Sequence, residues 1–160
     1  MVVVNVAVLD DEKEDLQRVC DFFEETNNNR IQYQCSCFQD TNHLFDQDYD
    51  LYMIDIEMAE INGLDVAETI KEKNPKAVIT INSKHKDLVF DSLKVGIFFF
   101  VRKENFKTDM EVVKNRLDPY YLENKKTYRY ETRDSVRNIL LSDIMYIEKK
   151  SHYIELHRKS

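Results

Sequence analysis

Three carboxylates stand directly behind runs of apolar residues in the first part of the sequence. Asp10 and Asp11 follow VVVNVAVL, and Asp55 follows LYMI. A short apolar run that ends abruptly in an acid is typical of a buried parallel strand whose last residue reaches the carboxyl edge of a sheet. Carboxylates gathered there repel one another unless a cation lies among them, and such hard oxygen ligands suit Mg²⁺. The sequence therefore predicts a magnesium site formed by these acids.

A hydroxyl and an ammonium group follow two later apolar runs. Ser83 comes after Asn82 behind AVITI, and Lys103 comes after Arg102 behind IFFFV. A metal would shield an incoming phosphate from the acids, and these two groups could then hold its oxygens. Asp55 would be the nucleophile, because an ionised aspartate needs no base to activate it. We therefore predict covalent phosphorylation of Asp55.

Each of these residues also has a simpler interpretation. Asp10 and Asp11 could cap a helix and supply its first-turn acids, and Ser83 could cap the helix that follows it. Phe100 lies in a run of three phenylalanines that a strand would pack on its two faces, and Lys103 alone could be an ordinary surface residue. Their common position at strand ends favours a functional site for the acids and the lysine.

Strands and helices must alternate to bring these residues to one edge. The apolar, β-branched runs predict strands over 2–9, 31–38, 51–54, 77–81 and 97–101. Apolar residues at helical spacing predict helices over about 16–23, 41–45, 64–73 and 88–93, and a last one around 110–117 that Pro119 ends. This alternation favours an α/β fold with a doubly wound, five-stranded parallel sheet, in which ligands bind beyond the carboxyl ends of the strands.

The pattern changes after the last predicted helix. Residues 121–126 are interpreted as a linker, and short alternating segments predict antiparallel strands over 128–132, 136–141, 144–148 and 153–157. Residues 121–160 have a net charge of 9 − 6 = +3, so residues 1–120 carry −10 of the total of −7. We therefore predict a domain over 1–120 and a short, incomplete all-β segment over 127–160, which is too small to be stable alone.

The composition is typical of a globular protein of the cytoplasm. Hydrophobic residues make up 42% of the chain and charged residues 33%, and no apolar run approaches the roughly 20 residues of a membrane span. The first apolar run lacks the basic region and the cleavage site of a secretory signal, which predicts a cytoplasmic protein without a membrane partner. Cys20, Cys35 and Cys37 lack the second pair that a zinc site needs, and we expect reduced thiols.

Four features, taken in order, resemble one family. Residues 1 to about 120 are similar to the receiver domain of two-component response regulators. The similarity rests on the segments VLDDE and IDIEMAEINGLDV, on Ser83 with Gly96 thirteen residues later, and on Lys103 seven residues beyond Gly96. The resemblance implies a flavodoxin-like sheet with strand order 2-1-3-4-5 and phosphorylation of Asp55 by a sensor histidine kinase. It also implies slow self-catalysed phosphorylation and dephosphorylation instead of enzymatic turnover, and a homodimer through the face of helix four, strand five and helix five.

The same resemblance assigns a role to each residue of the site. Asp11 and Asp55 would bind Mg²⁺ directly, Asp10 would bind it through water, and Glu57 would bind it through the backbone carbonyl. Ser83 and Lys103 would contact the phosphoryl group, and Phe100 would take the place of the switch aromatic residue.

The end of the sequence carries a second resemblance. ILLSDIMYIEKKSHYIELH is similar to the early strands of the LytTR DNA-binding domain. Lys149, Lys150 and His152 lie between two predicted strands, where such domains place a loop that enters a DNA groove. The segment spans only the beginning of such a domain, so DNA is an expected partner only where the output domain is complete. The two resemblances together imply a response regulator that controls transcription.

Two other functions fit parts of the pattern. A stand-alone receiver would signal by protein–protein contact and would not use the last segment to bind DNA. A Mg²⁺-dependent phosphohydrolase that forms an aspartyl phosphate uses Asp-x-Asp behind an apolar strand, and Asp55-Ile56-Glu57 is close to that pattern. In that class the nucleophile normally follows the first strand, whereas Asp55 follows the third predicted strand, which disfavours the enzyme.

Overall fold

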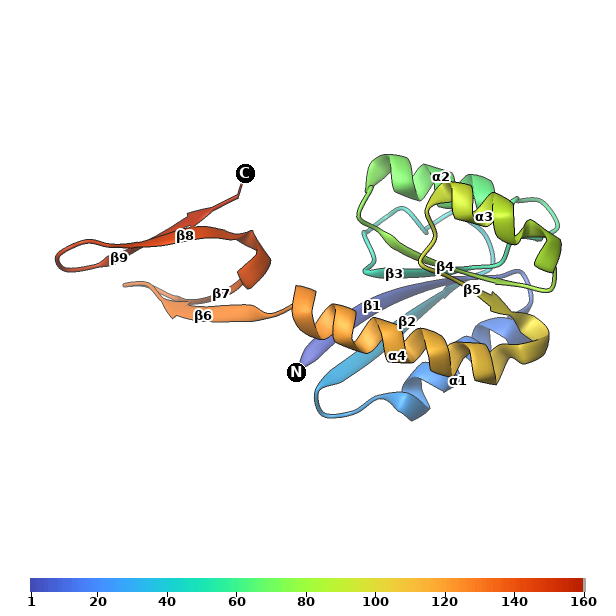
Figure 1. Cartoon of the computed structure of the whole chain (residues 1–160), viewed down its shortest axis with the longest axis horizontal. Coiled ribbons are helices and arrows are strands. Elements are labelled where there is room, and N and C mark those ends of the chain that lie inside the picture. Colours follow the sequence, from blue (N-terminus) through green and yellow to red (C-terminus); the bar gives the residue numbers. More distant parts are fainter. Residues whose placement is uncertain (160) are drawn as a thin grey trace. The chain divides into compact units, whose positions relative to one another are not determined.

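A five-stranded parallel sheet organises the first part of the protein, whose computed structural model describes residues 1–159 (Figure 1). Its strands are β1 (Val2–Leu9), β2 (Ile31–Phe38), β3 (Leu51–Ile54), β4 (Val78–Ser83) and β5 (Phe99–Arg102). They lie in the order β2-β1-β3-β4-β5, which confirms the predicted fold. The register places Leu9 beside Ile54, so β1 and β3 end side by side.

Helices cover both faces of this sheet. The first part of α4 (Phe106–Asn124) and α1 (Lys13–Thr26) lie on one face, and α2 (Gly63–Lys73) and α3 (Val89–Val95) lie on the other (Figure 1). Single turns of 3₁₀-helix at 86–88 and 103–105 precede α3 and α4. This two-sided cover explains why β3 and β4 consist wholly of buried residues. Within residues 1–159, no helix combines the length and the apolar character needed to cross a bilayer.

The contacts of α1 show how a helix is attached to the sheet. Leu16, Val19 and Phe23 recur at helical spacing and are buried. The ring of Phe23 stacks on Tyr33 of β2, with the ring centroids 4.6 Å apart. On the other face, apolar residues of α2 join those of the sheet in one buried cluster. Burial of these apolar stripes therefore fixes both layers of helices on the sheet.

The predicted short helix over 41–45 is wrong, because residues 39–47 form bends and turns. The Asp40 carboxylate accepts a hydrogen bond from the backbone N–H of Asn42 (2.9 Å), and such local bonds compete with helix formation. Among residues 41–45 only Leu44 is buried, so the burial of apolar surface would stabilise a helix there only slightly. The connection between β2 and β3 is therefore a loop anchored by the buried side chains of Leu44 and Tyr49.

The prediction that Pro119 ends the last helix is also wrong. α4 continues to Asn124 and includes the first residues of the predicted linker over 121–126. A proline inside a helix removes one backbone hydrogen bond and costs about 3 kcal/mol. Leu117 and Tyr121 lie one helical turn apart around it and are both buried, and this burial offsets the cost.

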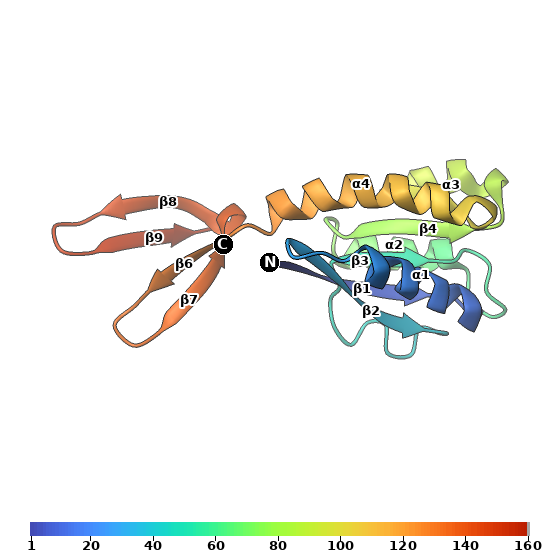
Figure 2. The same ribbon diagram turned by 90° about the horizontal axis from the view of Figure 1, so that it is seen from below.

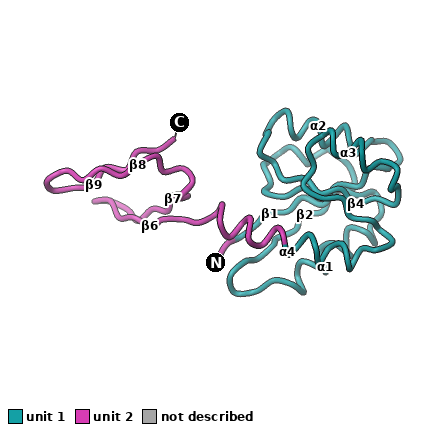
Figure 3. The backbone as a smooth tube through the Cα atoms, viewed as in Figure 1, with its two compact units in different colours: residues 1, 3–115 teal, residues 2, 116–160 magenta. Residues whose placement is uncertain are grey.

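The chain divides into two compact units inside α4: one contains Val3–Asn115, and the other begins at Arg116 (Figure 3). The second unit contains β6 (Thr127–Glu131), β7 (Val136–Leu140), β8 (Ile144–Lys149) and β9 (Ile154–Arg158). β6 pairs with β7 and β8 pairs with β9, both antiparallel as predicted, and Figure 2 shows them as two separate ribbons. These strands leave large apolar side chains exposed, among them Tyr128, Val136, Met145, Tyr146, Ile147 and Ile154.

Candidate functional site

The acids behind β1 and β3 lie together at the carboxyl edge of the sheet. Hydrogen bonds from the Asp10 N–H to the Phe38 carbonyl (3.1 Å) and from the Asp55 N–H to the Leu9 carbonyl (2.9 Å) extend the sheet ladder one residue beyond the strands. Both acids are almost fully buried, with 2% and 5% of Asp10 and Asp55 exposed. Carboxylate oxygens of these two residues and of Asp11 lie within 4.8 Å of one another. The sheet itself therefore fixes a cluster of three carboxylates.

Lys103 supplies the positive charge of this cluster. Its ammonium nitrogen donates a hydrogen bond to Asp10 (2.8 Å) and lies 3.3 Å from a carboxylate oxygen of Asp55. It also donates to Asp15 of α1 (2.7 Å), a residue that the sequence analysis did not assign to the site. Asp15 lies in the first turn of α1 beside the buried Leu16. This position is the only feature of the sequence that could have indicated its contact with Lys103.

The acids at this edge fit a divalent cation. Asp10, Asp11 and Asp55 supply three carboxylates, while Lys103 contacts two of them and shares its charge with Asp15. One ammonium group therefore leaves the cluster with a negative charge, which is unfavourable for buried acids. Closely spaced carboxylate oxygens are the ligands that Mg²⁺ prefers. The residues present could thus hold Mg²⁺, as the sequence predicts.

Burial determines the electrostatics of Asp55 and Lys103. Loss of water around the Asp55 carboxylate raises its pKa to about 6; Lys103 opposes this shift, and Asp10 adds to it. Burial by itself lowers the pKa of Lys103, but hydrogen bonds to Asp10 and Asp15 and the charge of Asp55 outweigh burial and raise that pKa. Lys103 therefore remains a cation, whereas the charge of Asp55 depends on the groups placed around it.

The loop after Asp55 is held against the acids. The Ala59 N–H donates to the Asp11 carboxylate (2.9 Å), and the Gly63 N–H donates to the Ile56 carbonyl (2.8 Å). A side chain cannot replace the hydrogen of Gly63, because a Cβ there would lie 1.9 Å from the backbone oxygen of Asp55. The start of α2 therefore packs directly on the backbone of Asp55.

A cleft of about 160 Å³ opens beside Asp55 and is lined by Asp11, Glu12, Asp55, Glu57, Lys84, His85 and Lys103. Within it, Nε2 of His85 lies 2.6 Å from a carboxylate oxygen of Glu57. The space is several times the roughly 30 Å³ that one water occupies, which leaves room for a phosphoryl group. Glu57 therefore lines the cleft, while the binding of Mg²⁺ by its backbone carbonyl stays a prediction. His85 is a lining residue that the sequence analysis did not assign.

Three predicted residues of the site do not line this cleft: Asp10, which lies in the acidic cluster, and Ser83 and Phe100. Ser83 ends β4 and is fully buried, and its Oγ accepts a hydrogen bond from the backbone N–H of His85 (3.1 Å). Phe100 lies on β5 opposite Ile81 and packs against the apolar cluster that contains residues of the sheet and α2. Phe100 thus has the contacts of a packed strand residue, whereas the Ser83 hydroxyl closes a local turn and caps neither the 3₁₀ turn at 86–88 nor α3.

The predicted DNA-contacting residues lie together in the second unit, at the turn between β8 and β9. The backbone N–H of Lys150 donates to the Tyr153 carbonyl (2.9 Å) and closes this turn. Lys149 and His152 are exposed, whereas the ammonium group of Lys150 contacts Glu148 (2.8 Å). The turn therefore presents two basic side chains freely and holds the third against an acid.

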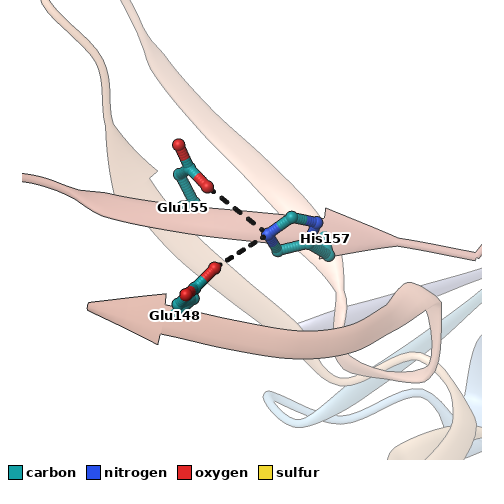
Figure 4. Close-up of side chains that lie close together, drawn as sticks. All are labelled: Glu148, Glu155 and His157. Carbon is teal, nitrogen blue, oxygen red and sulfur yellow. Dashed lines mark ion pairs between the residues drawn. The ribbon is translucent and has the colours of Figure 1, made fainter. Parts of the chain in front are cut away.

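A second group of potential metal ligands lies on these two strands. Glu148 and Glu155 are directly opposite each other, and Nε2 of His157 lies 3.8 Å and 3.6 Å from their carboxylates (Figure 4). The imidazole also stacks on Tyr146, with the ring centroids 4.2 Å apart. The ligand atoms are close enough to share a cation, but groups that include exposed acids commonly hold none. The sequence analysis missed this group because only the strand register brings it together.

Comparison with known proteins gives a match for most of the first unit. Residues 6–114 match the response regulator receiver domain. The structure resembles the response regulator TrrA of Thermotoga maritima in complex with Mg²⁺ and BeF, with 27% identity, a TM-score of 0.60, and coverage of 70% of this chain and 97% of that chain. The BeF3-activated receiver domain of DrrB (20% identity, TM-score 0.60, coverage 74% and 99%) and the response regulator domain of T. maritima CheB (16%, 0.61, 75% and 96%) share the fold. A comparison with curated proteins gave no match.

The matched residues span the features built above from the sequence. They include Asp10, Asp11 and Asp55 at the sheet edge, the Gly63 contact that holds the loop, and Lys103. The match covers more than half of the chain, and the strand order is that of the receiver fold. The chain therefore belongs to the response regulator receiver family, and its first unit is the receiver domain of a two-component response regulator.

Proposed function

We propose that a sensor histidine kinase phosphorylates Asp55 in the presence of Mg²⁺ and that the receiver then controls transcription through a LytTR-type output domain, which begins in the last segment. The observation that carries this proposal is the group of the buried Asp10, Asp55 and Lys103 with the partly buried Asp11 at the sheet edge. Membership of the receiver family supports it, as does the Mg²⁺ and BeF complex of the similar T. maritima protein.

In the proposed reaction, the Asp55 carboxylate attacks the phosphorus atom of a phosphohistidine on the kinase. The P–N bond breaks as the P–O bond forms, and the imidazole leaves with the bonding electrons and takes up a proton. Mg²⁺ held by the three acids and by the backbone carbonyl of Glu57 would neutralise charge on the transferred group. Lys103, already 3.3 Å from Asp55, then pairs with a phosphoryl oxygen. The protein would catalyse only its own slow phosphorylation and dephosphorylation.

The charge of the phosphoryl group would change the surface around α3. Ser83 accepts a hydrogen bond from His85 and keeps a hydroxyl proton, which it can donate to a phosphoryl oxygen. Phe100 lies on the neighbouring strand and is only partly buried, so it can follow that movement. Phe90 and Leu93 of α3 are 77% and 56% exposed, and this apolar surface suits a homodimer through α3, β5 and α4. These elements are the predicted helix four, strand five and helix five, because the predicted helix over 41–45 does not form.

Intact mass after incubation with Mg²⁺ and acetyl phosphate tests the phosphorylation. We expect wild-type protein to gain one phosphoryl group, Asp55→Asn to gain none, and EDTA to prevent the gain. Asp48→Asn removes an exposed carboxylate outside the cleft and serves as the matched control, which should be phosphorylated like wild type. Repeated hydrolysis of phosphate esters without a phosphorylated protein would instead support the phosphohydrolase and reject the switch.

The DNA contact is tested separately by gel shift at low salt. We expect binding that weakens as salt is added, because contacts to phosphates release counterions. The double variant Lys149→Ala/Lys150→Ala should weaken it more than Lys125→Ala/Lys126→Ala, which removes the same charge outside the turn. Equal effects of the two variants would reject the turn as the contact. Complete absence of binding would favour the receiver that signals by protein contact.

A further inference from the structure

Three thiols gather where α1 packs on β2, away from the acidic edge. Cys35 and Cys37 are two residues apart on β2, so their side chains share the face on which Tyr33 stacks against α1. Cys20 of α1 meets them: its sulfur lies 3.0 Å from that of Cys37, and Cys35 is near enough to raise its pKa. The proposed phosphorylation uses none of these residues.

We propose that Cys20 and Cys37 form an intramolecular disulfide when the protein meets a small-molecule disulfide as oxidant. A disulfide is about 2.0 Å long, so the two sulfur atoms need to approach by only about 1 Å. β2 is an edge strand and Cys37 is exposed, so an oxidant can reach this sulfur. Cys20 is partly buried behind it, in the position of the second, resolving thiol.

The reaction proceeds by two thiol–disulfide exchanges. The Cys37 sulfur, as thiolate, attacks one sulfur of the oxidant RSSR, which forms a mixed disulfide and releases RS⁻. The Cys20 sulfur then loses its proton and attacks the Cys37 sulfur, which closes the protein disulfide and releases the second RS⁻. The two protein thiols lose two protons and two electrons, and RSSR is reduced to two molecules of RSH.

The surroundings of the thiols set the rate of this exchange. Burial and the contact with Cys20 raise the pKa of Cys37 to about 12, and the hydrogen bond with Cys35 is the main cause that raises the pKa of Cys20. Because only the thiolate attacks, the raised pKa values make the exchange slow near neutral pH.

A shared metal ion is a weaker interpretation of the same cluster. Within residues 1–159, the groups of three metal-ligating side chains whose atoms lie within 4.8 Å of one another are Asp10, Asp11 and Asp55, and Glu148, Glu155 and His157. The three thiols do not form such a group, whereas two of them are in direct contact. The geometry therefore favours a bond between two sulfurs over a three-thiolate metal site.

Mass spectrometry of the whole chain tests the disulfide. The reduced protein is incubated with oxidised glutathione and then alkylated in denaturant with N-ethylmaleimide. We expect one alkylated cysteine in place of three, and a monomer lighter by two hydrogen atoms before alkylation. Trypsin cuts after Arg18, Arg30 and Lys71, so the bond should join peptide 19–30 to peptide 31–71 until a reductant separates them.

Variants identify the pair. Cys35→Ser should still yield the linked peptides, whereas Cys20→Ser should yield none, and circular dichroism melts verify that both variants fold. The pairing is overturned if Cys35→Ser abolishes the link, if oxidised wild type keeps three reactive thiols, or if the link joins two chains.

Discussion

At the scale of single residues, three carboxylates share the ammonium group of Lys103. Its contacts to Asp15 (2.7 Å) and Asp10 (2.8 Å) are shorter than its contact to Asp55 (3.3 Å). A lysine held in this way must give up part of these contacts before it can pair with a phosphoryl group on Asp55. Asp15 on α1 thus competes with the phosphoryl group for the ammonium group of Lys103, and it is not one of the predicted metal ligands.

Replacement of Asp15 by asparagine should speed phosphorylation by acetyl phosphate. The change removes one negative charge from the edge and releases Lys103, which lowers the barrier by about 1 kcal/mol and raises the rate roughly fivefold. The rate is measured by intact mass over time at fixed Mg²⁺. Glu14→Gln, which alters an exposed neighbour on α1, should leave the rate unchanged. A slower Asp15→Asn protein would show that Asp15 positions Lys103 instead of competing for it.

Replacement of Asp55 by asparagine should stabilise the metal-free protein at neutral pH. Burial raises the pKa of Asp55 from 3.8 to about 6 in the folded state, so the folded protein binds this proton more tightly than the unfolded chain does. Wild type therefore loses stability as the pH rises from about 4 to about 6, and the loss is complete above that window. Asparagine has no such charge, and the variant should be more stable by on the order of 3 kcal/mol at pH 8.

Urea unfolding in EDTA at several pH values measures this difference. The gain should shrink as the pH falls and become small near pH 4, where residue 55 is uncharged in both folded proteins. Asp48→Asn, on the surface, should show no such pH dependence. A gain that stays constant between pH 4 and pH 8 would contradict the role of the buried charge.

At the scale of elements, the start of α2 determines where Asp55 can lie. Gly63 opens this helix with its Cα against the backbone of Asp55. Gly96 ends α3 with a φ of 82°, a left-handed conformation that glycine adopts without strain. The two glycines therefore serve different needs: Gly63 allows a close approach, and Gly96 allows a turn.

Gly63→Ala should be far more harmful than Gly96→Ala. The new Cβ at Gly63 would lie 1.9 Å from a backbone oxygen, so α2 or Asp55 must move, at a cost on the order of 3 kcal/mol. At Gly96 the nearest atom is 4.0 Å away, and the cost is about 1 kcal/mol for the left-handed backbone. Denaturant unfolding and acetyl phosphate labelling of Asp55 should both show this order. Equal losses in the two variants would contradict the contact.

At the scale of the whole molecule, the two units differ in how well they bury their apolar residues. The parallel sheet has buried strands and helices on both faces. The strands β6 to β9 form two-stranded pairs and leave large apolar side chains exposed. Small pieces of this kind do not bury enough surface to offset the loss of chain entropy. The first unit should therefore account for the cooperative stability of the protein.

A chain that ends at Asn124, with α4 complete, should fold like the full protein. We expect its unfolding temperature to stay within about 4 °C of the full chain, a shift equivalent to roughly 1 kcal/mol. Phosphorylation of Asp55 should proceed at the same rate. Residues 125–160 alone should give no cooperative transition by circular dichroism. A large loss of stability in the shortened chain would show that β6 to β9 support the receiver.

The sequence by itself determined the sheet and the identity of its edge residues. The apolar runs that end in Asp10, Asp55 and Lys103 locate the strands, because burial on both faces demands continuous apolar residues. The parallel alternation then brings the ends of these strands to one edge, and the structure places the carboxylates and the lysine in contact there. This part follows from patterns that are local in the sequence.

Only the tertiary structure decided the partners that packing and register create. Asp15 reaches Lys103, and Cys20 reaches Cys37, because α1 lies on the sheet at one particular rotation, which no local pattern reveals. α4 continues past Pro119 because burial of its flanking residues outweighs the local preference of proline. Helix propensities differ by less than about 1 kcal/mol among ordinary residues and by about 3 kcal/mol for proline, and the summed burial of a packed face exceeds them.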